Sequence, residues 1–223
     1  MSKTIAIIPA RGGSKRLPKK NIKMLGQLPL LAYSIIYAKK HDFIDEVIVS
    51  TDCPDIKNTA LKYGAKVIDR PLQLSGDYEP TVTALAHVLD NLDYKVDQVI
   101  LLQATNPLRP FELLNEAFQK FKECKCSSLF TVTRDHHKLG KINMERFIPF
   151  NYIPGQRSQD LEPLFYENGL LYITKADLIK ENEIISKDAI PFIVAHPFTQ
   201  VDIDTQDDFD YAEYLIEKHK YRL

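Results

Sequence analysis

Short apolar runs alternate with longer amphipathic stretches along most of the 223 residues. Runs of about four to eight apolar residues predict buried strands, and longer stretches with apolar positions three and four apart predict helices. Strands are predicted at 4–9, 46–50, 66–68, 98–103, 128–133, 169–174 and 191–195. Helices are predicted at 29–40, 54–63, 80–92, 111–123, 175–181 and from about 206. This order is typical of βαβ units and predicts an α/β fold with a mostly parallel sheet.

The alternation fails between residues 134 and 167, where polar and aromatic residues mix around Pro149, Pro154 and Pro163. We interpret this segment as an excursion from the sheet, an inserted arm used for dimer contact. The remainder has the length and pattern of one unit, so we expect a single domain over 1–223.

Composition narrows the class of protein. A formal net charge of −1 gives no bulk attraction to nucleic acid or an anionic membrane. The first residues lack the apolar core of a signal peptide, and no apolar run approaches the roughly 20 residues that span a bilayer. We therefore expect a cytoplasmic protein with neither nucleic acid nor membrane as partner. Cys53, Cys124 and Cys126 are too few for a disulfide framework, which predicts reduced thiols.

The segment IPARGGSKRLPKKN, residues 8–21, begins where the first predicted strand ends. Ligands of open α/β sheets sit beyond this end of the strands. Gly12 and Gly13 allow main-chain N–H groups to approach phosphate oxygens. The surrounding cations are Arg11, Lys15, Arg16, Lys19 and Lys20. The segment fits neither the Walker nor the dinucleotide-binding pattern; a solvated basic turn is the alternative to a phosphate loop.

The segment VDIDT places Asp202 and Asp204 two residues apart on a predicted strand. Their side chains should leave one face, with backbones about 6.5 to 7 Å apart. Mg²⁺ is commonly held by one or two carboxylates together with substrate phosphates. With the cationic loop, the pair implies a nucleoside triphosphate and its metal. Alternatively, Asp204 or Thr205 caps the last helix.

Two further polar segments lie where substrates are expected. LLQATNPLRP ends the most apolar strand and contributes neutral hydrogen-bonding groups, Gln103, Thr105 and Asn106. QRSQDLEPLFYENGLLYI places Arg157 and the residues 166–168 before another strand. Part of the first segment is accounted for by a turn, and Arg157 fits a surface residue of the arm equally well.

Taken together, these four segments resemble the acylneuraminate cytidylyltransferases, or CMP-sialic acid synthetases, over nearly the whole chain. The resemblance implies a Rossmann-like nucleotidyltransferase fold and a homodimer. It also implies that CMP passes from CTP to the C2 hydroxyl of a nine-carbon 2-keto sugar acid, N-acetylneuraminate first, with release of pyrophosphate. The implied cofactor is Mg²⁺, with Mn²⁺ as a substitute.

The resemblance also assigns residues. Those implied to hold CTP are Arg11, Gly12, Gly13, Lys15, Lys20, Asn21, Arg70 and Thr81. Those implied to face the sugar acid are Gln103, Thr105, Arg157, Asn168 and Tyr172. Asp202 and Asp204 would bind the metal and would act in catalysis together with Arg11, Lys15 and Lys20. Lys141, on the arm, would reach the active site of the dimer partner.

The chain departs from the family pattern at two places. Many bacterial relatives have an Arg-Pro pair where Tyr166 and Glu167 stand, and some have an aromatic pair near Ile184 and Ile185 that lines the N-acyl pocket. Legionaminate, pseudaminate, KDN and the eight-carbon Kdo are therefore alternative substrates. A sugar-1-phosphate nucleotidyltransferase and a non-catalytic nucleotide-binding module are more distant alternatives.

Overall fold

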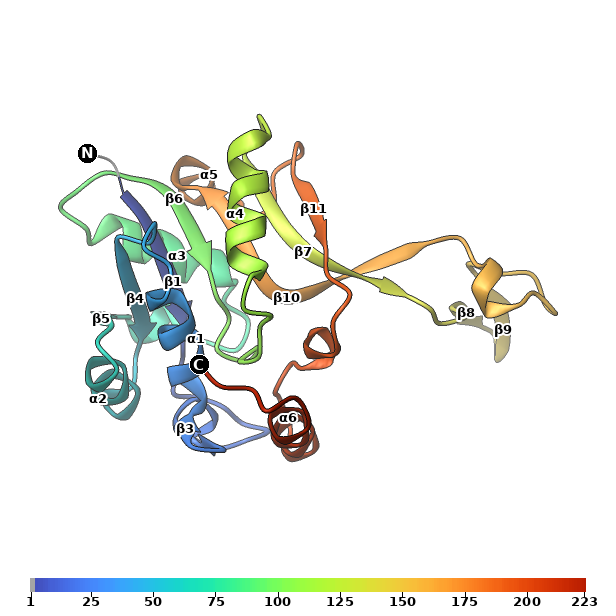
Figure 1. The fold of residues 1–223 in the computed structure, drawn as a ribbon, viewed down its shortest axis with the longest axis horizontal. Coiled ribbons are helices and arrows are strands. Elements are labelled where there is room, and N and C mark those ends of the chain that lie inside the picture. The colour runs from blue at the N-terminus through green and yellow to red at the C-terminus, as the bar shows by residue number, and fades with distance from the viewer. Residues whose placement is uncertain (1–2) are drawn as a thin grey trace.

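The computed structural model describes residues 3–223 and has a seven-stranded central sheet (Figure 1). The strand order is β11-β7-β10-β6-β1-β4-β5. The strands are β1 (Lys3–Pro9), β4 (Glu46–Thr51), β5 (Lys66–Asp69), β6 (Val96–Leu101), β7 (Ser128–Asp135), β10 (Leu164–Lys175) and β11 (Ile190–Ile193). Only β10 runs antiparallel to its neighbours, β6 and β7, among these paired strands. The predicted mostly parallel α/β sheet is confirmed.

Helices cover both faces of this sheet (Figure 1). They are α1 (Leu30–Lys39), α2 (Pro54–Lys62), α3 (Thr81–Asp90), α4 (Leu113–Glu123), α5 (Ala176–Lys180) and α6 (Gln206–His219). Four 3-10 turns are η1 (Lys20–Ile22), η2 (Leu72–Leu74), η3 (Ser158–Asp160) and η4 (Pro197–Gln200). Each helix lies within a few residues of its predicted bounds.

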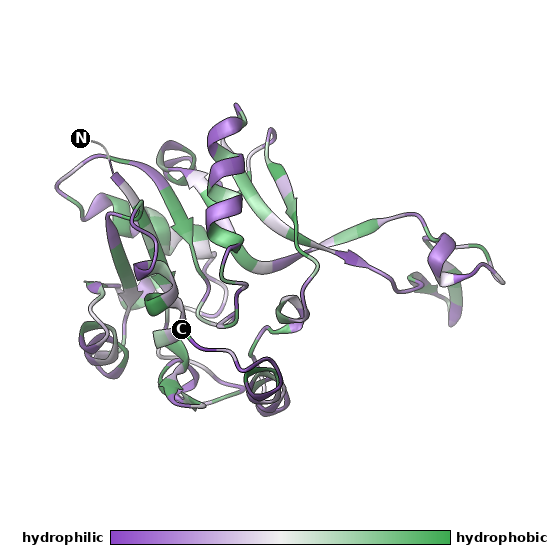
Figure 2. Cartoon of the chain, in the orientation of Figure 1, coloured by the Kyte–Doolittle hydropathy of each residue, from purple (hydrophilic) through white to green (hydrophobic). Residues whose placement is uncertain are grey.

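Alternate side chains of β1 explain why its buried part, residues 5–8, is apolar throughout. Ala6 and Ile8 belong to the core cluster that α1, α2 and α4 cover, whereas Ile5 and Ile7 belong to the cluster under α3 and α5. Successive side chains of a strand point to opposite faces, so a strand buried on both sides has no polar position. Figure 2 shows the resulting contrast between apolar central strands and helices with a polar outer side.

The segment 134–167, which we call the arm, projects from the body of the protein (Figure 1). Its two ends are continuations of β7 and β10, which pair Arg134 with Phe165 and Asp135 with Leu164. Its tip is a two-stranded hairpin of β8 (Gly140–Asn143) and β9 (Arg146–Pro149). The excursion is thus confirmed, and part of it is ordinary strand. A second short hairpin, β2 (Met24–Leu25) with β3 (Leu28–Pro29), follows the basic loop.

Two local predictions are wrong. The segment 201–205 forms no strand, although Val201 and Ile203 are buried as a strand residue would be. Cys124 and Cys126, just beyond α4, are joined in a disulfide with Cα atoms 5.2 Å apart, whereas Cys53 is a free thiol. The spacing alone gave no sign that the chain turns tightly enough there to bring two sulfurs together.

Among residues 3–223, no helix has both the length and the apolar character that crossing a bilayer requires.

Candidate active site

Two clefts adjoin the ends of β1 and β6. The first has a volume of about 470 Å³ and lies between the basic loop, the connection from η2 to α3, and the end of β6. The second, of about 550 Å³, lies between the outer ends of β7 and β10 and the segment 199–202. Gln103 lines both clefts, while Asp204 lines the first and Asp202 the second. The two clefts therefore meet at the end of β6.

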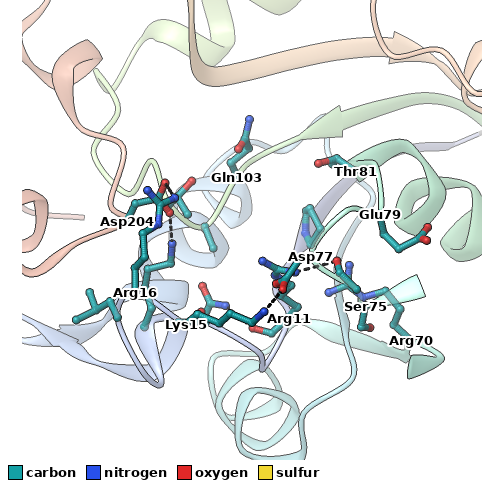
Figure 3. A pocket seen from close by; sticks show the side chains of 18 of the residues that line it. Arg11, Lys15, Arg16, Arg70, Ser75, Asp77, Glu79, Thr81, Gln103 and Asp204 are labelled. Carbon is teal, nitrogen blue, oxygen red and sulfur yellow. Dashed lines mark hydrogen bonds and ion pairs between the residues drawn. The ribbon is translucent and has the colours of Figure 1, made fainter. Parts of the chain in front are cut away.

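The connection between η2 and α3 supplies an anion to the basic loop (Figure 3). Arg11 Nη1 lies 2.9 Å from Asp77 Oδ1 and donates to the Gly76 carbonyl at 2.8 Å. Lys15 Nζ pairs with the other oxygen of Asp77. The hydrogen bond from Lys15 and the charges of Lys15 and Arg11 hold the pKa of Asp77 below its usual value. Two of the predicted phosphate-binding cations thus share one carboxylate.

Gly12 has a structural role at the start of the loop. Its N–H donates to Asp52 Oδ1 at 2.9 Å, and a Cβ at this position would lie 2.8 Å from the Cβ of Cys53. Asn21 donates from Nδ2 to the Arg11 carbonyl at 3.0 Å. Gly12 therefore permits close contact with the loop after β4. Its N–H was expected to face phosphate oxygens, but in the structure it is bonded to Asp52 instead. A Cβ at Gly13 would meet no atom within 4 Å.

Lys20 ties the basic loop to the segment that carries the two aspartates. Its side chain is largely buried, and Nζ donates to the Ile203 carbonyl at 2.6 Å and to Asp204 Oδ1 at 2.8 Å. Arg16 Nη2 pairs with the second oxygen of Asp204 at 2.5 Å. A loop near the N-terminus and a segment more than 180 residues later are thus held together by ion pairs at the first cleft.

Asp202 and Asp204 project away from the core because the residues between and before them are buried. Val201 and Ile203 are 1% and 0% exposed, so the carboxylates leave the opposite side of the extended chain. Burial is the main cause that raises the pKa of Asp202, opposed by a hydrogen bond from the Thr105 side chain, and the charge of Asp204 raises it further. Asp202 and Asp204 thus flank a buried residue without forming the predicted strand, and they line different clefts.

Thr205 caps α6. Helix capping therefore accounts for Thr205 in the segment VDIDT but not for Asp204. The Thr205 hydroxyl accepts from the N–H of Asp208, and the Asp208 carboxylate accepts in return from the N–H of Thr205. This capping box satisfies the helix start without Asp204. The Asp204 carboxylate remains in the first cleft, together with Lys20 and Arg16.

Arg70 and Thr81 line the far end of the first cleft. Arg70 is 9% exposed, its Nε and Nη2 are buried without a hydrogen-bond partner in the described part of the chain, and burial lowers its pKa. Buried donors without partners are costly, so these N–H groups fit a ligand with acceptor atoms. Thr81 is the first residue of α3, where the partial positive charge of a helix start favours anions.

Asn168 lines the second cleft, but its side-chain amide is already engaged. Oδ1 accepts from Thr131 at 2.6 Å and Nδ2 donates to Thr133 at 2.9 Å. Asn106 Nδ2 donates to the Val201 carbonyl at 2.8 Å and to that of Asn168 at 3.3 Å. This buried network shapes the second cleft and holds the aspartate segment against the sheet.

Three residues that the resemblance placed near the site lie away from both clefts. Arg157 is on the arm, with Nε 2.7 Å from Asp160 Oδ2, and lines neither cleft. Ile184 and Ile185 pack against the core cluster beneath α3 rather than against either cleft. Conversely, sequence analysis missed several residues of the clefts: Asp77, Glu79, Arg134, Asp135, His136 and His137. The available signals were the predicted strand end at 133 and the predicted helix start at 80.

Comparisons with known proteins show the family of this chain. A model of the cytidylyltransferase family matches residues 5–222. The pseudaminic acid cytidylyltransferase of Campylobacter jejuni is 34% identical, with 96% of each chain covered. The CMP-N,N'-diacetyllegionaminic acid synthase of Legionella pneumophila is 32% identical, with 98% of each covered. The N-acylneuraminate cytidylyltransferase of Streptococcus agalactiae is 33% identical over 93% of this chain and 52% of the relative.

A solved structure shares the fold. CMP:2-keto-3-deoxy-manno-octonic acid synthetase in complex with CTP superposes with a TM-score of 0.76, at 19% identity, and covers 98% of this chain and 100% of that one. The sheet order and the flanking helices thus define an α/β fold like that of nucleotidyltransferases. Within that class, the chain belongs to the cytidylyltransferase family.

Proposed function

We propose that this protein transfers CMP from CTP to the C2 hydroxyl of a nonulosonate, a nine-carbon 2-keto sugar acid, and releases pyrophosphate. The observation that carries the proposal is the meeting of two clefts at Gln103, with one aspartate of the pair in each. One cleft has the cations that a triphosphate needs, and the other has the polar groups that a sugar needs. The names of the relatives, which act on pseudaminic, legionaminic and acylneuraminic acids, support the substrate class.

The first cleft would hold CTP. Arg11 and Lys15 would exchange Asp77 for phosphate oxygens, since their pairs with it are partly exposed to solvent. The unpartnered N–H groups of Arg70 and the start of α3 at Thr81 would bind the remaining acceptors of the nucleotide. Lys20 stays beside Asp204 and contributes positive charge where the pyrophosphate departs.

Asp202 and Asp204 fit a Mg²⁺ ion, or Mn²⁺ in its place, that arrives with the nucleotide. No group of three or more His, Cys, Asp or Glu side chains with metal-binding geometry occurs in residues 3–223. Two carboxylates completed by water and phosphate oxygens are a common Mg²⁺ site, so the residues present are sufficient. When bound, such an ion neutralises charge on the attacked phosphate. Arg16, which is exposed, would give up its ion pair with Asp204 and so free that carboxylate oxygen for the ion.

The second cleft would hold the sugar acid with its C2 hydroxyl at the junction. The hydroxyl oxygen attacks the α-phosphorus, the hydroxyl proton passes to water or to a carboxylate of the aspartate pair, the bond to pyrophosphate breaks, and no covalent intermediate with the protein forms. Gln103 and Tyr172 border the junction and would orient the sugar. Holding both reactants in line removes much of the entropic cost of their encounter.

The proposal is tested by pyrophosphate release. The protein with CTP and Mg²⁺ is given N-acetylneuraminate, KDN, legionaminate, pseudaminate, Kdo and sugar 1-phosphates in turn, with ATP, GTP and UTP as controls. We expect release with CTP and one nine-carbon acid, which also identifies the preferred substrate. Release with Kdo alone or with a sugar phosphate alone would replace the proposed substrate class, and no release with any acid would overturn the proposal.

We further propose a cytoplasmic homodimer in which the arm of one subunit reaches the second cleft of the other. The tip of the arm exposes large apolar side chains, among them Ile142 at 80%, Met144 at 90% and Ile153 at 75%. Such a surface fits contact with another protein surface. Arg157 and Lys141 lie on the same arm and away from the clefts of their own chain. They would therefore contribute to the active site of the partner subunit.

Complementation tests the dimer. Arg157→Ala and Asp202→Asn variants should each be nearly inactive, because one lacks the sugar-acid contact and the other the metal ligand. After mixing and subunit exchange, half of the dimers contain one intact site of two, so activity should rise to about a quarter of the wild-type value. A monomer in sedimentation velocity, or no gain on mixing, would contradict the shared site.

A further inference from the structure

The second cleft extends from the junction to the base of the arm. At the junction, the hydroxyl of Tyr172 donates to Glu167 Oε2 at 3.2 Å, and Glu167 pairs with Val132 on β7. At the other end, the cleft is lined by residues 134–137. Asp135 stands three residues beyond Val132, which is about 10 Å along a strand. Since the proposed function places C2 of the sugar acid at the junction, the part of the sugar that reaches the base of the arm is the part farthest from C2.

His137 is held in one orientation at this end of the cleft. Asp135 Oδ1 accepts from the N–H of His137 at 2.8 Å and lies 2.6 Å from its ring Nδ1. The carbonyl of His137 accepts from Asn151 Nδ2 at 2.9 Å, and Asn151 Oδ1 accepts from the N–H of Leu139 at 2.8 Å. The side chain of His137 is nevertheless 85% exposed. Exposed pairs of this kind add little stability, so the fixed orientation suits the binding of a ligand.

The contact with Asp135 decides which ring nitrogen of His137 carries a proton. The backbone N–H and the ring of His137 hold the pKa of Asp135 below its usual value. The ionised carboxylate only accepts, so Nδ1 of His137 is the protonated nitrogen. Nε2, the other polar atom of the ring, accepts when the ring is neutral and donates when the ring is protonated. A hydroxyl group can pair with Nε2 in both states, whereas an amide N–H or a carboxylate can pair with it in only one.

The other residues that line the second cleft near this pair are polar as well. They are Arg134, His136, Tyr166 and Gln200. Gln200 Nε2 lies 2.6 Å from the Tyr166 hydroxyl and so joins η4 to β10 beside the cleft. Polar groups of this kind lose hydrogen bonds to water when an apolar group covers them. The base of the arm therefore suits a hydroxylated part of the sugar better than the methyl group of an acyl substituent.

We propose that His137 is a specificity-determining residue that binds a hydroxyl group at the end of the sugar's carbon chain, on C8 or C9, and that Asp135 positions its imidazole. This inference rests on the proposed function. The contact lies far from the reacting atoms, so it strengthens the bound state and the transition state equally. It therefore lowers KM for the sugar acid and leaves kcat unchanged. The cleft thus prefers sugar acids whose chain extends beyond C7.

The test pairs a variant of the protein with a shortened substrate. The probes are the nine-carbon acid that the wild type prefers and its analogue that ends at C7, which periodate cleavage and borohydride reduction give from N-acetylneuraminate and synthesis gives from another acid. In His137→Asn the amide can still donate to Asp135 in the place of Nδ1, but no atom remains in the place of Nε2. We expect KM for the nine-carbon acid to rise about three- to tenfold, with kcat and KM for CTP within twofold. With the analogue, kcat/KM should change less than twofold.

Two further variants complete the test. His137→Gln has an amide near the place of Nε2 and should recover most of the loss, whereas His219→Asn, at the exposed end of α6 and away from both clefts, should alter no value. If the wild type does not turn over the analogue, its inhibition constant against the nine-carbon acid is compared instead. An equal loss with both acids, an unchanged KM in His137→Asn, or a fall in kcat alone would each overturn the inference and leave the proposed function intact. Failure of the wild type to use any nine-carbon acid would overturn both.

Discussion

Replacing Asp202 with Asn is expected to lower kcat by about a thousand-fold or more while CTP still binds. Asp202 lines the second cleft beside the junction, and its carboxylate makes neither of the ion pairs that engage Asp204. An amide of the same shape cannot supply the negative charge that the proposed ion needs. The contribution of that ion is greatest as charge builds on the attacked phosphate, so the loss falls on the transition state rather than on the bound nucleotide.

Single-turnover rates of pyrophosphate release and calorimetric titration with CTP together measure this effect. Asp207→Asn, the same change in the exposed first turn of α6, serves as the control and should leave both values near those of the wild type. Near-normal turnover in Asp202→Asn would remove Asp202 from the reaction. A loss of CTP affinity as large as the loss of rate would instead assign Asp202 to nucleotide binding.

Arg109→Ala should cost about 3 to 5 kcal/mol in the free energy of unfolding. The guanidinium of Arg109 is completely buried and donates to the carbonyl oxygens of Leu170 and Gln103, at 2.7 and 2.9 Å, and to the hydroxyl of Ser34 at 3.0 Å. These bonds join β10, the end of β6 and α1 behind the clefts. Alanine would remove the buried donor to the Leu170 carbonyl and leave a cavity of the size of the lost side chain, whereas the Gln103 carbonyl would keep its bond from the Ser34 hydroxyl.

Urea unfolding of the two proteins measures the difference. Arg109→Lys should recover only part of the loss, because an ammonium group cannot span three acceptors that a planar guanidinium reaches at once. Arg146→Ala, at an exposed position of β9, is the control for loss of one positive charge. A cost below about 1 kcal/mol for Arg109→Ala would mean that water or rearranged neighbours replace the buried bonds.

Sequence alone predicted the strands and helices whose apolar pattern is unambiguous. It failed where tertiary contacts decide the outcome. The segment 201–205 has the alternating pattern of a strand because Val201 and Ile203 are apolar. In the structure, however, the N–H of Ile203 donates to the carbonyl of Thr105, which lies in a loop and not in a neighbouring strand. The early start of β10 was hidden by the polar residues 166–168, whose partners lie on β7. The direction of β10 leaves no trace in a hydrophobic pattern.

The candidate site was predictable to the extent that it lies at strand ends. The cationic loop comes directly after an apolar run, the two aspartates alternate with the apolar Val201 and Ile203, and they line the first cleft or the second. Asp77 was missed because a loop has no periodicity and its pairing with Arg11 bridges more than 60 residues. The distance of Arg157 from the clefts depends on the course of the arm, which no local signal encodes.

Asp77 has a consequence for how the protein behaves among the many polyanions of a cell. Without nucleotide, Arg11 and Lys15 already have a counter-charge that belongs to the chain itself. An anion that enters the first cleft must compete with the Asp77 carboxylate, whose effective concentration is high because it belongs to the same chain. Weakly charged or singly bound phosphates therefore gain little by displacing it, and a ligand of high charge that makes several contacts at once is favoured.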